Sequence, residues 1–222
     1  MSVLGLDTST SAASACVLRG DGESFEVAPP AERLQSPPAH ASELMPAVAD
    51  VMDRAGVGWD DLDALAVGVG PGTFTGLRIG LATARALASA NGLPLRRVSS
   101  LAALAAGIDA SLRLPLIDAR RGELFGALYD ADERLWAPFA APPEELVARL
   151  REGGFTPLAA GNGSVRFRGM LEEAGVPVAP DDSQAHVVRA VHVCRLAAEA
   201  PDEPPEAVLP DYLRDPDAKP QQ

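Results

Sequence analysis

The apolar and polar positions of the chain repeat in the same order in its two halves. The first half opens with LGLDTSTSAASACVL and the second with LPLIDARRGELFGALY. Each segment predicts an apolar strand that ends on an aspartate, then a turn and a second, alternating strand. Asp7 and Asp118 occupy equivalent places in this pattern. The repeat therefore predicts two hairpins of the same design.

The elements after each hairpin repeat as well. A third extended stretch is followed by a helix, a strand, a small-residue loop and another helix. The predicted helices cover residues 42–55 and 143–151, the strands residues 64–69 and 156–160, and the loops are GPG at 70–72 and GNG at 161–163. A mixed sheet flanked by helices, made twice, is the layered solution for this order of elements.

This pattern predicts an α/β chain of two lobes, residues 1–105 and residues 106–222. The tail from about residue 201 contains six prolines and several acids, so much of it is expected to be irregular. We expect this tail to pack back on the first lobe through Leu209, Tyr212 and Leu213.

Composition and charge narrow the class of protein. The chain has 222 residues, of which 47% are hydrophobic and 23% charged, as in a packed globular protein. It has neither an apolar run of about 20 residues nor a signal-peptide start, so we expect a cytoplasmic protein with no membrane contact. Cys16 and Cys194 have apolar neighbours and are expected to be reduced core thiols rather than a disulfide.

The net charge of −12 argues against tight, direct binding of nucleic acid. The densest basic clusters are three pairs of arginines, which we interpret as solvated surface. These pairs are Arg96 with Arg97, Arg120 with Arg121, and Arg166 with Arg168.

The predicted helix over residues 42–55 has an unusually wide apolar face, because Met45, Ala49 and Met52 broaden its main stripe. It either packs on its own sheet and the next helix, or it offers a surface to a partner, for which the methionines are well suited. Pro46 adds a further alternative. If Ser42 is the cap, either the first turn is distorted or the helix begins later.

The helix after the GPG loop is predicted to run to about Ala90 and to end at Asn91 and Gly92. Small residues four apart lie on one of its faces, and its two glycines each cost about 1 kcal/mol relative to alanine. A close neighbouring helix, from this chain or from another subunit, would offset that cost. The residues that we assign to a partner interface are Leu44, Met45, Val48, Met52, Gly76, Leu77, Arg78, Gly80, Leu81 and Ala84.

Five motifs give the chain a resemblance to a known family. They are LGLDTST at the start, HASELMP at 40–46, GVGPGTFTGLRIGLATARALA at 68–88, IDARRGELFGALY at 117–129 and PDYLRDPDA at 210–218. In this order they resemble the TsaB (YeaZ) family of bacterial tRNA threonylcarbamoyladenosine synthesis. The resemblance covers nearly the whole chain.

The resemblance implies a duplicated actin-like fold, of the ASKHA and ribonuclease H-like type. It also implies a scaffold subunit without catalysis of its own, which binds and activates the catalytic subunit TsaD, with the ATPase TsaE joining the complex. The reaction adds threonylcarbamoyl to N6 of adenosine 37 in tRNAs that read codons starting with A. We expect tRNA contact only through the complex, ATP and a metal ion only in the partner subunits, and a homodimer when the chain is alone.

The residues that carry metal in TsaD-like relatives are replaced here. Their His-x-x-x-His pair corresponds to Ser100 and Leu104, and the histidines at positions 40, 186 and 192 form no local pair with metal-ligand spacing. We therefore predict no metal site and interpret all three imidazoles as surface or partly buried groups.

The predicted nucleotide site is also altered. Actin-like ATPases use an Asp-x-Gly turn after each first strand, whereas the turns here read DTS and DAR. Weak nucleotide binding is predicted at Asp7, Thr8, Ser9, Gly70 and Gly72. Besides the scaffold, two hypotheses stand: an ATP-binding phosphotransferase or ATPase of the same fold, and a metallopeptidase, against which the missing ligands weigh most.

Overall fold

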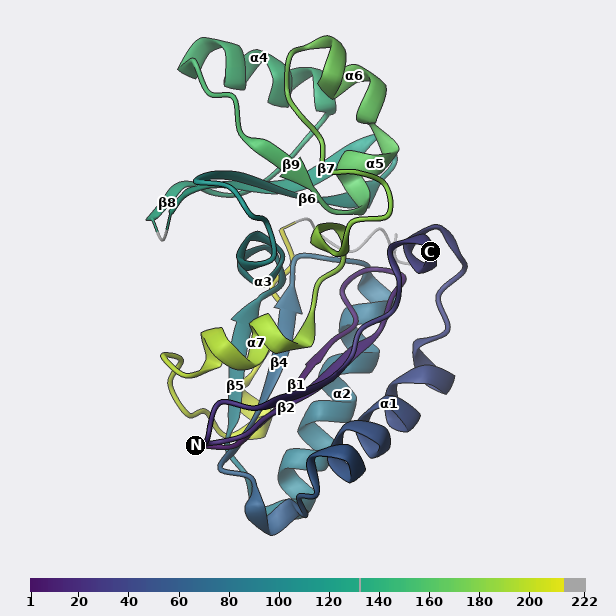
Figure 1. Ribbon diagram of the computed structural model, residues 1–222, viewed down its shortest axis with the longest axis vertical. Helices are drawn as coiled ribbons and strands as arrows, with labels where there is room; N and C mark the ends of the chain where they lie inside the picture. The colour runs from purple at the N-terminus through teal and green to yellow at the C-terminus, as the bar shows by residue number, and fades with distance from the viewer. Residues whose placement is uncertain (132, 214–222) are drawn as a thin grey trace, which may run out of the picture.

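The computed structural model describes residues 1–131 and 133–213, which form two lobes, each built around its own sheet (Figure 1). The first sheet has five strands in the order β3-β2-β1-β4-β5, and the second has four in the order β8-β7-β6-β9. Among the described residues, no helix is long and apolar enough to cross a membrane.

The first lobe follows the predicted order of elements closely. Its strands are β1 (Val3–Asp7), β2 (Ser14–Leu18), β3 (Ser24–Val27), β4 (Ala64–Gly70) and β5 (Leu95–Ser99). Its helices are α1 (His40–Ala55), α2 (Phe74–Asn91) and α3 (Ser100–Ala106), with 3-10 turns at Ala31–Gln35 and Trp59–Asp61.

The second lobe has longer strands and shorter helices. Its strands are β6 (Leu112–Arg120), β7 (Glu123–Asp130), β8 (Glu133–Ala141) and β9 (Leu158–Ala160). The helices are α4 (Pro143–Gly153), α5 (Asn162–Arg166), α6 (Arg168–Glu173) and α7 (Ala190–Ala197), with 3-10 turns at Gln184–His186 and Pro205–Ala207.

The duplication predicted from the sequence is confirmed by the pairing of the strands. In both lobes the first two strands form an antiparallel hairpin, and the first strand lies parallel to the strand after the first helix. Asp7 and Asp118 both lie near the end of the first strand. The two lobes differ after their small-residue loops. The GPG loop is followed by α2, which has 18 residues, whereas the GNG loop is followed by the two short helices α5 and α6.

The start of α1 differs from both alternatives derived from Pro46. The helix begins at His40, two residues before the expected cap, and continues through Pro46 in its second turn. The Ser42 hydroxyl donates a 3.0 Å hydrogen bond to the Ala39 carbonyl instead of capping the helix. Pro46 removes one N–H without ending the helix, because the packed apolar face of α1 extends on both sides of it.

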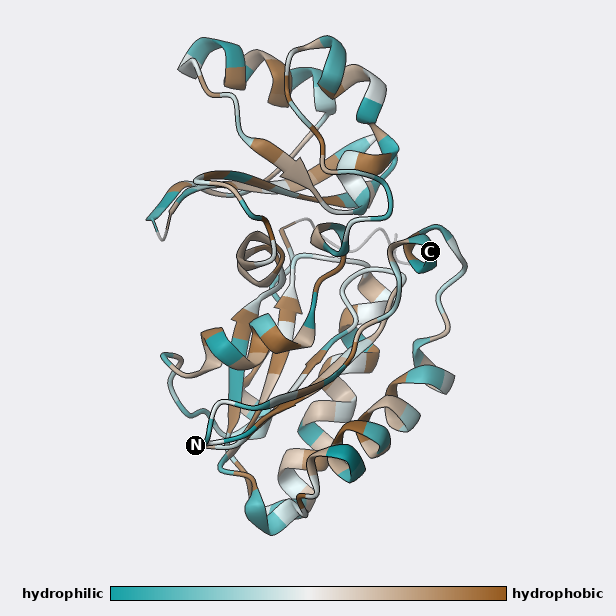
Figure 2. Cartoon of the chain, in the orientation of Figure 1, coloured by the Kyte–Doolittle hydropathy of each residue, from teal (hydrophilic) through white to brown (hydrophobic). Residues whose placement is uncertain are grey.

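Two cores sandwich the first sheet, whose strands are mostly hydrophobic (Figure 2). One core joins the sheet to α1 and α2, and the other joins its opposite face to α3 and α7. A third core fills the second lobe between its sheet, α4 and α6. Cys16 and Cys194 are free and buried in the second of these cores, as expected.

Helix α7 corrects the predicted division of the chain. Residues from 106 were assigned to the second lobe, with only the tail from about 201 returning to the first. However, Val191, Val193 and Cys194 pack in the core of the first sheet with Val3 and Cys16. The chain therefore returns to the first lobe before α7, since that face of the sheet needs a helix to cover it.

A buried carboxylate holds α7 in this position. Glu26 on β3 accepts a 3.0 Å hydrogen bond from the Val191 amide in the first turn of α7 and forms an ion pair with Arg189. A carboxylate at a helix N-terminus satisfies free N–H groups and the helix dipole together.

The tail is attached to the first lobe through two of the three expected side chains, since the Tyr212 ring stacks on Phe74 and Leu213 packs against the core formed with α3 and α7. Val208 is fully buried and its carbonyl accepts a hydrogen bond from Arg85, whereas Leu209 is 59% exposed and anchors nothing. Leu95 bridges Glu203 in antiparallel fashion, and the Asp211 amide donates to Val69. The tail is therefore held by the side chains of Val208, Tyr212 and Leu213 together with backbone hydrogen bonds, and sequence patterns do not reveal the latter.

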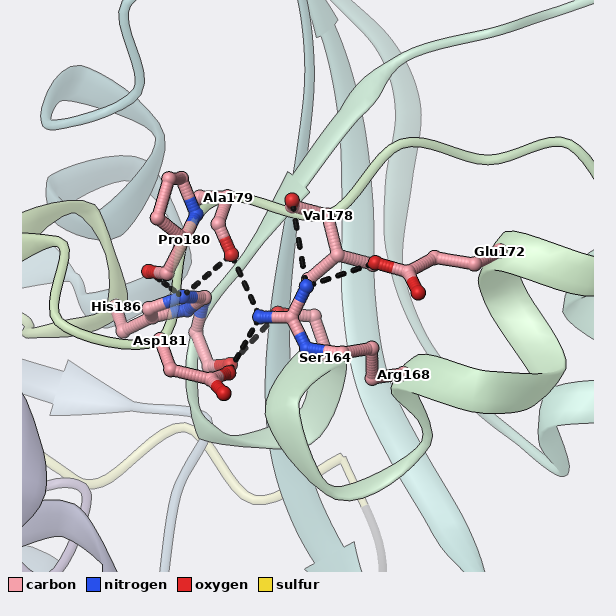
Figure 3. A network of polar contacts seen from close by, with 9 residues as sticks. Ser164, Arg168, Glu172, Val178, Ala179, Pro180, Asp181 and His186 are labelled. Atoms are coloured by element: carbon pink, nitrogen blue, oxygen red, sulfur yellow. Dashed lines mark hydrogen bonds and ion pairs between the residues drawn. The ribbon is translucent and has the colours of Figure 1, made fainter.

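Polar contacts correct the interpretation of Arg168 as solvated surface, and they bury His186 more deeply than the surface or partly buried position expected for it (Figure 3). Arg168 joins α6 to the following loop through Glu172, the Ala179 carbonyl and Asp181. His186 is fully buried, accepts from the Gly161 amide at Nδ1 and contacts the Pro180 carbonyl at Nε2. These side chains hold the GNG loop and the 178–186 segment together.

Arg96 is a further correction, since it is largely buried and pairs with Asp202. His40 and His192 are also buried, at 2% and 9% exposure, more deeply than the surface or partly buried positions expected for them. Each of these polar residues is covered by segments that are distant in sequence.

We predict that His192 makes the folded state less stable as the pH falls. Burial, followed by the charges of Arg189 and Arg195, lowers the pKa of His192 from 6.5 to about 4, opposed by Glu26. Between those values the unfolded chain binds a proton that the folded chain refuses, so up to about 3 kcal/mol of stability is lost.

Urea denaturation from neutral pH to about pH 4 checks this. His192→Gln should flatten the profile relative to the wild type, and parallel profiles would contradict the prediction. His40 and Asp7 contribute equally to both proteins and cancel in the comparison.

Candidate functional site

The turn after β1 is organised around the buried carboxylate of Asp7. One oxygen accepts hydrogen bonds from the Ser9 amide at 2.8 Å and the Ser9 hydroxyl at 2.7 Å, and the other accepts from the Ser100 hydroxyl at 2.8 Å. Burial raises the pKa of Asp7, while the hydrogen bonds from Ser9 and Ser100 oppose this shift. All of these partners belong to the chain itself.

The first turns of α2 pack directly onto this β1–β2 turn. A Cβ on Gly76 would collide with the Thr8 carbonyl, and one on Gly80 with the Thr8 hydroxyl. The same hydroxyl donates a 2.8 Å hydrogen bond to the Gly76 carbonyl. The close neighbour that the two glycines require is therefore this turn and not a second helix, which corrects the sequence-based expectation.

The five residues predicted to bind nucleotide weakly are brought together, but their surroundings are filled by the chain. Asp7, Thr8 and Ser9 are at most 1% exposed. A Cβ on Gly72 would collide with Ser9, and one on Gly70 would lie 3.0 Å from the Asp211 carbonyl. These two glycines, which were predicted to let the backbone approach a phosphate, instead allow close contact with other segments of the same chain.

Ser100 and Leu104, at the positions of the relatives' metal ligands, both lie on α3 and are fully buried. The Ser100 hydroxyl donates to Asp7 and accepts a 3.2 Å hydrogen bond from the Gly70 amide. Over residues 1–131 and 133–213, no three His, Cys, Asp or Glu side chains are grouped closely enough to hold a metal ion.

Asp118 repeats the geometry of Asp7 in the second lobe. Its carboxylate accepts a 2.8 Å hydrogen bond from the Arg120 amide, two residues on, as Asp7 does from Ser9. Here Arg166 lies 2.8 Å from the other carboxylate oxygen, and Arg120 lies 3.4 Å from it. Guanidinium groups therefore neutralise this carboxylate from within the chain.

A cleft of about 950 Å³ lies between the lobes. It is lined by the first turns of α1 and α2, the β6–β7 turn and the tail at 211–213. At its edge, Phe74 stacks on Tyr212 with ring centroids 5.4 Å apart, and the Arg78 guanidinium lies 3.7 Å above the Phe74 ring. Arg78, which the sequence assigned to the partner interface, thus connects α2 to the tail.

Most of the predicted interface residues lie inside the lobe. Apart from Met45, which is 46% exposed, and the exposed Arg78, they are buried against the first sheet or the β1–β2 turn. The buried residues are Leu44, Val48, Met52, Gly76, Leu77, Gly80, Leu81 and Ala84. The broad apolar face of α1 is thus explained by the core of its own lobe.

The outer face of α1 and α2 is formed by other, mostly small residues. They include Ala41, Met45 and Ala49 on α1, and Thr75, Arg78, Ala82 and Ala86 on α2; farther along, α1 also exposes the charged residues Asp50, Asp53 and Arg54. The two helices lie side by side against the same face of the first sheet (Figure 1). Only Arg78 and Arg85 are charged within α2, and Arg85 is directed to the tail.

The sequence contained one signal for this face. Surface helices normally carry charges at exposed positions. The turns of α2 after Arg78 expose only alanine and serine, although the chain as a whole has a net charge of −12.

Comparison with known proteins points to one family. The family model "TsaD: tRNA N6-adenosine threonylcarbamoyltransferase" matches residues 35–147. The tRNA threonylcarbamoyladenosine biosynthesis protein TsaB of Escherichia coli K12 is 31% identical over 96% of this chain and 95% of its own length. The TsaB protein of Bacillus subtilis 168 is 29% identical over 96% and 94% of the two chains.

Solved structures similar to this chain point to the same family. YeaZ from Pseudomonas aeruginosa matches with a TM-score of 0.75 and 29% identity, over 96% of this chain and 99% of that chain. A second structure, described as having similarity to peptidase YEAZ from the same organism, matches with a TM-score of 0.77, 31% identity and the same coverage. The chain belongs to the TsaB (YeaZ) family.

The resemblance carried by the five motifs is therefore confirmed, and so is the predicted duplicated, two-lobed α/β fold. Four of the TsaB motifs converge on one region: the β1–β2 turn, the start of α1, the GPG loop with α2, and the β6–β7 turn. The fifth, at 210–218, lies within the described residues only as far as Leu213, which lines the cleft.

We predict that Asp7→Ala destabilises the fold by about 2–4 kcal/mol, because it leaves the Ser9 and Ser100 donors buried without an acceptor. Asp21→Ala is a matched control, since Asp21 makes the same turn with Glu23 on the surface. It should stay within about 0.5 kcal/mol of the wild type. Chemical denaturation measures both, and equal losses would refute a special role for Asp7.

Proposed function

We propose that this chain is a non-catalytic scaffold subunit in tRNA threonylcarbamoyladenosine biosynthesis, and that it docks and activates the catalytic subunit TsaD through the outer face of α1 and α2. Family membership places the chain in that biosynthesis. The observation that carries the docking proposal is the exposed face of α2, which after Arg78 carries only alanine and serine on an acidic protein, beside the small residues Ala41 and Ala49 of α1.

The chemistry of this face suits a stable protein contact. Interface cores are depleted of charged residues, and small side chains let another helix approach closely. Ala41, Met45 and Ala49 are spaced four apart along α1, and Met45 provides an adaptable side chain. Phe74, Arg78 and Tyr212 add the aromatic and arginine groups that often dominate binding energy.

The proposed absence of intrinsic catalysis is supported by the hydrogen bonds and ion pairs that already occupy the two conspicuous carboxylates. Asp7 is engaged by serine donors and Asp118 by arginines, so neither carboxylate is directed at a metal-bound phosphate. Ser100 and Leu104 offer no imidazole to a metal. These contacts weigh against the ATPase and metallopeptidase hypotheses, and we assign ATP and metal chemistry to the partner subunits.

The same face accounts for the other proposed assemblies. Without TsaD, two copies of the chain would cover their apolar faces with each other, giving a homodimer that competes with the heteromeric complex. TsaE would join through the complex. Contact with tRNA would be left to the partners, because a chain of net charge −12 repels phosphate.

We predict that Ala49→Glu and Ala82→Glu each weaken the complex with cognate TsaD at least tenfold, because each buries an unpaired charge at the contact. Both positions are exposed on helices where glutamate is well tolerated, so the variants should fold. Ala148→Glu, on an exposed position of α4 in the second lobe, is the matched control.

Size-exclusion chromatography with light scattering measures complex formation, and circular dichroism reports folding. If both interface variants form the complex as the wild type does, the α1–α2 face is not the docking surface. If the wild type forms no complex at micromolar concentration, the scaffold proposal itself fails.

A further inference from the structure

Two helix N-termini meet at the cleft between the lobes. Helix α1 begins at His40 after Ala39, and α2 begins at Phe74 after Thr73. Neither start has a side-chain cap or an acidic residue at its first two positions. Because the first N–H groups of a helix have no partner within it, two sets of donors and two positive dipole ends face the same space.

His40 provides an independent observation at the same place. Its side chain is 2% exposed and lines the cleft, yet neither ring nitrogen makes a hydrogen bond among the described residues. The Nε2 atom lies beside the first turn of α2, 3.2 Å from where a Cβ on Gly76 would stand. The Thr10 backbone is close enough to act on the pKa of the ring but makes no hydrogen bond of normal geometry with it, and so poorly paired a buried imidazole is costly.

Charged groups of both signs surround His40. Burial lowers the pKa of His40, the Thr10 backbone and Glu43 oppose this shift, and Arg33 adds to it. Across the cleft, Asp118 is already paired with Arg166, while Arg120 and Asp211 also face the space. The neutral ring therefore has a donor and an acceptor available, and an incoming negative charge would favour its protonated form.

The remaining walls of the cleft are apolar and partly aromatic. They include Pro38, Pro71, Phe74, Ile79, Phe125 and Tyr212. A volume of about 950 Å³ with apolar walls and a few converging polar groups is typical of a small-molecule site.

We propose that the cleft binds a small anion with a flat apolar body, a carboxylate or a phosphate monoester, whose charge is held by His40 and the amides at the starts of α1 and α2. The aromatic rings of Phe74, Phe125 and Tyr212 would hold the body of the ligand. The Asp118 turn forms one wall of this site, whereas Asp7 does not line it. The site requires no partner protein, so it goes beyond the scaffold function.

The test uses the full-length chain with phenyl phosphate and benzoate as anionic probes and benzyl alcohol as their uncharged counterpart. Nitrogen NMR of the imidazole rings reports on three histidines, and His40→Gln assigns the signal. Both anions should shift the His40 resonances to saturation, leave His186 and His192 unchanged, and bind more tightly as the pH falls.

Two variants separate the contributions. His40→Gln should weaken binding of phenyl phosphate by about tenfold or more, as expected for a lost hydrogen bond to a charged group. Thr75→Asp puts a negative charge at the start of α2, which favours the helix but repels the anion, and should have a similar effect. Ala86→Asp, exposed near the other end of α2, should bind like the wild type.

The proposal is overturned if benzyl alcohol binds as tightly as the anions, if all three histidines shift without saturation, or if both variants retain wild-type affinity. Thr75→Asp keeps the test decisive if His40→Gln fails to fold. None of these outcomes depends on TsaD, so failure here is distinguishable from failure of the scaffold proposal.

Discussion

The first lobe depends on one buried carboxylate. Asp7 binds Ser9 of its own turn and Ser100 at the start of α3, and Ser100 in turn binds the Gly70 amide at the end of β4. Three segments far apart in sequence are thereby fixed around one charge. The glycines of α2 and the GPG loop then pack on the turn that this charge organises. Ser100 is thus a structural residue that joins α3 and the end of β4 to this turn.

The sequence predicted the elements well because hydrophobic periodicity records them locally. The two hairpins, with Asp7 and Asp118 near the ends of their first strands, lie where the pattern placed them, and so does the glycine that ends α2. The early start of α1 was missed, because its first turn has no capping side chain to mark it. The return of α7 was missed because a short amphipathic helix does not reveal which sheet it covers.

The candidate site was predicted in outline and wrong in detail. Periodicity located α1 and α2 correctly but could not separate the side chains that face the sheet from those that face outward. Val48 and Leu81 are core residues, whereas the less conspicuous Ala49 and Ala82 are exposed. The cleft residues were missed because His40, Phe125 and Tyr212 meet only in three dimensions.

The return of the chain through α7 makes the second lobe an insertion within the first. The segment from about β6 to the 3-10 turn at Gln184–His186 is enclosed between parts of one larger core. A ribosome would therefore release the inserted lobe before the enclosing one can be completed, since one face of the first sheet stays uncovered until α7 emerges. The backbone also passes between the lobes twice, once into the inserted lobe and once out of it. Two such connections favour a hinge motion of one lobe against the other over free rotation.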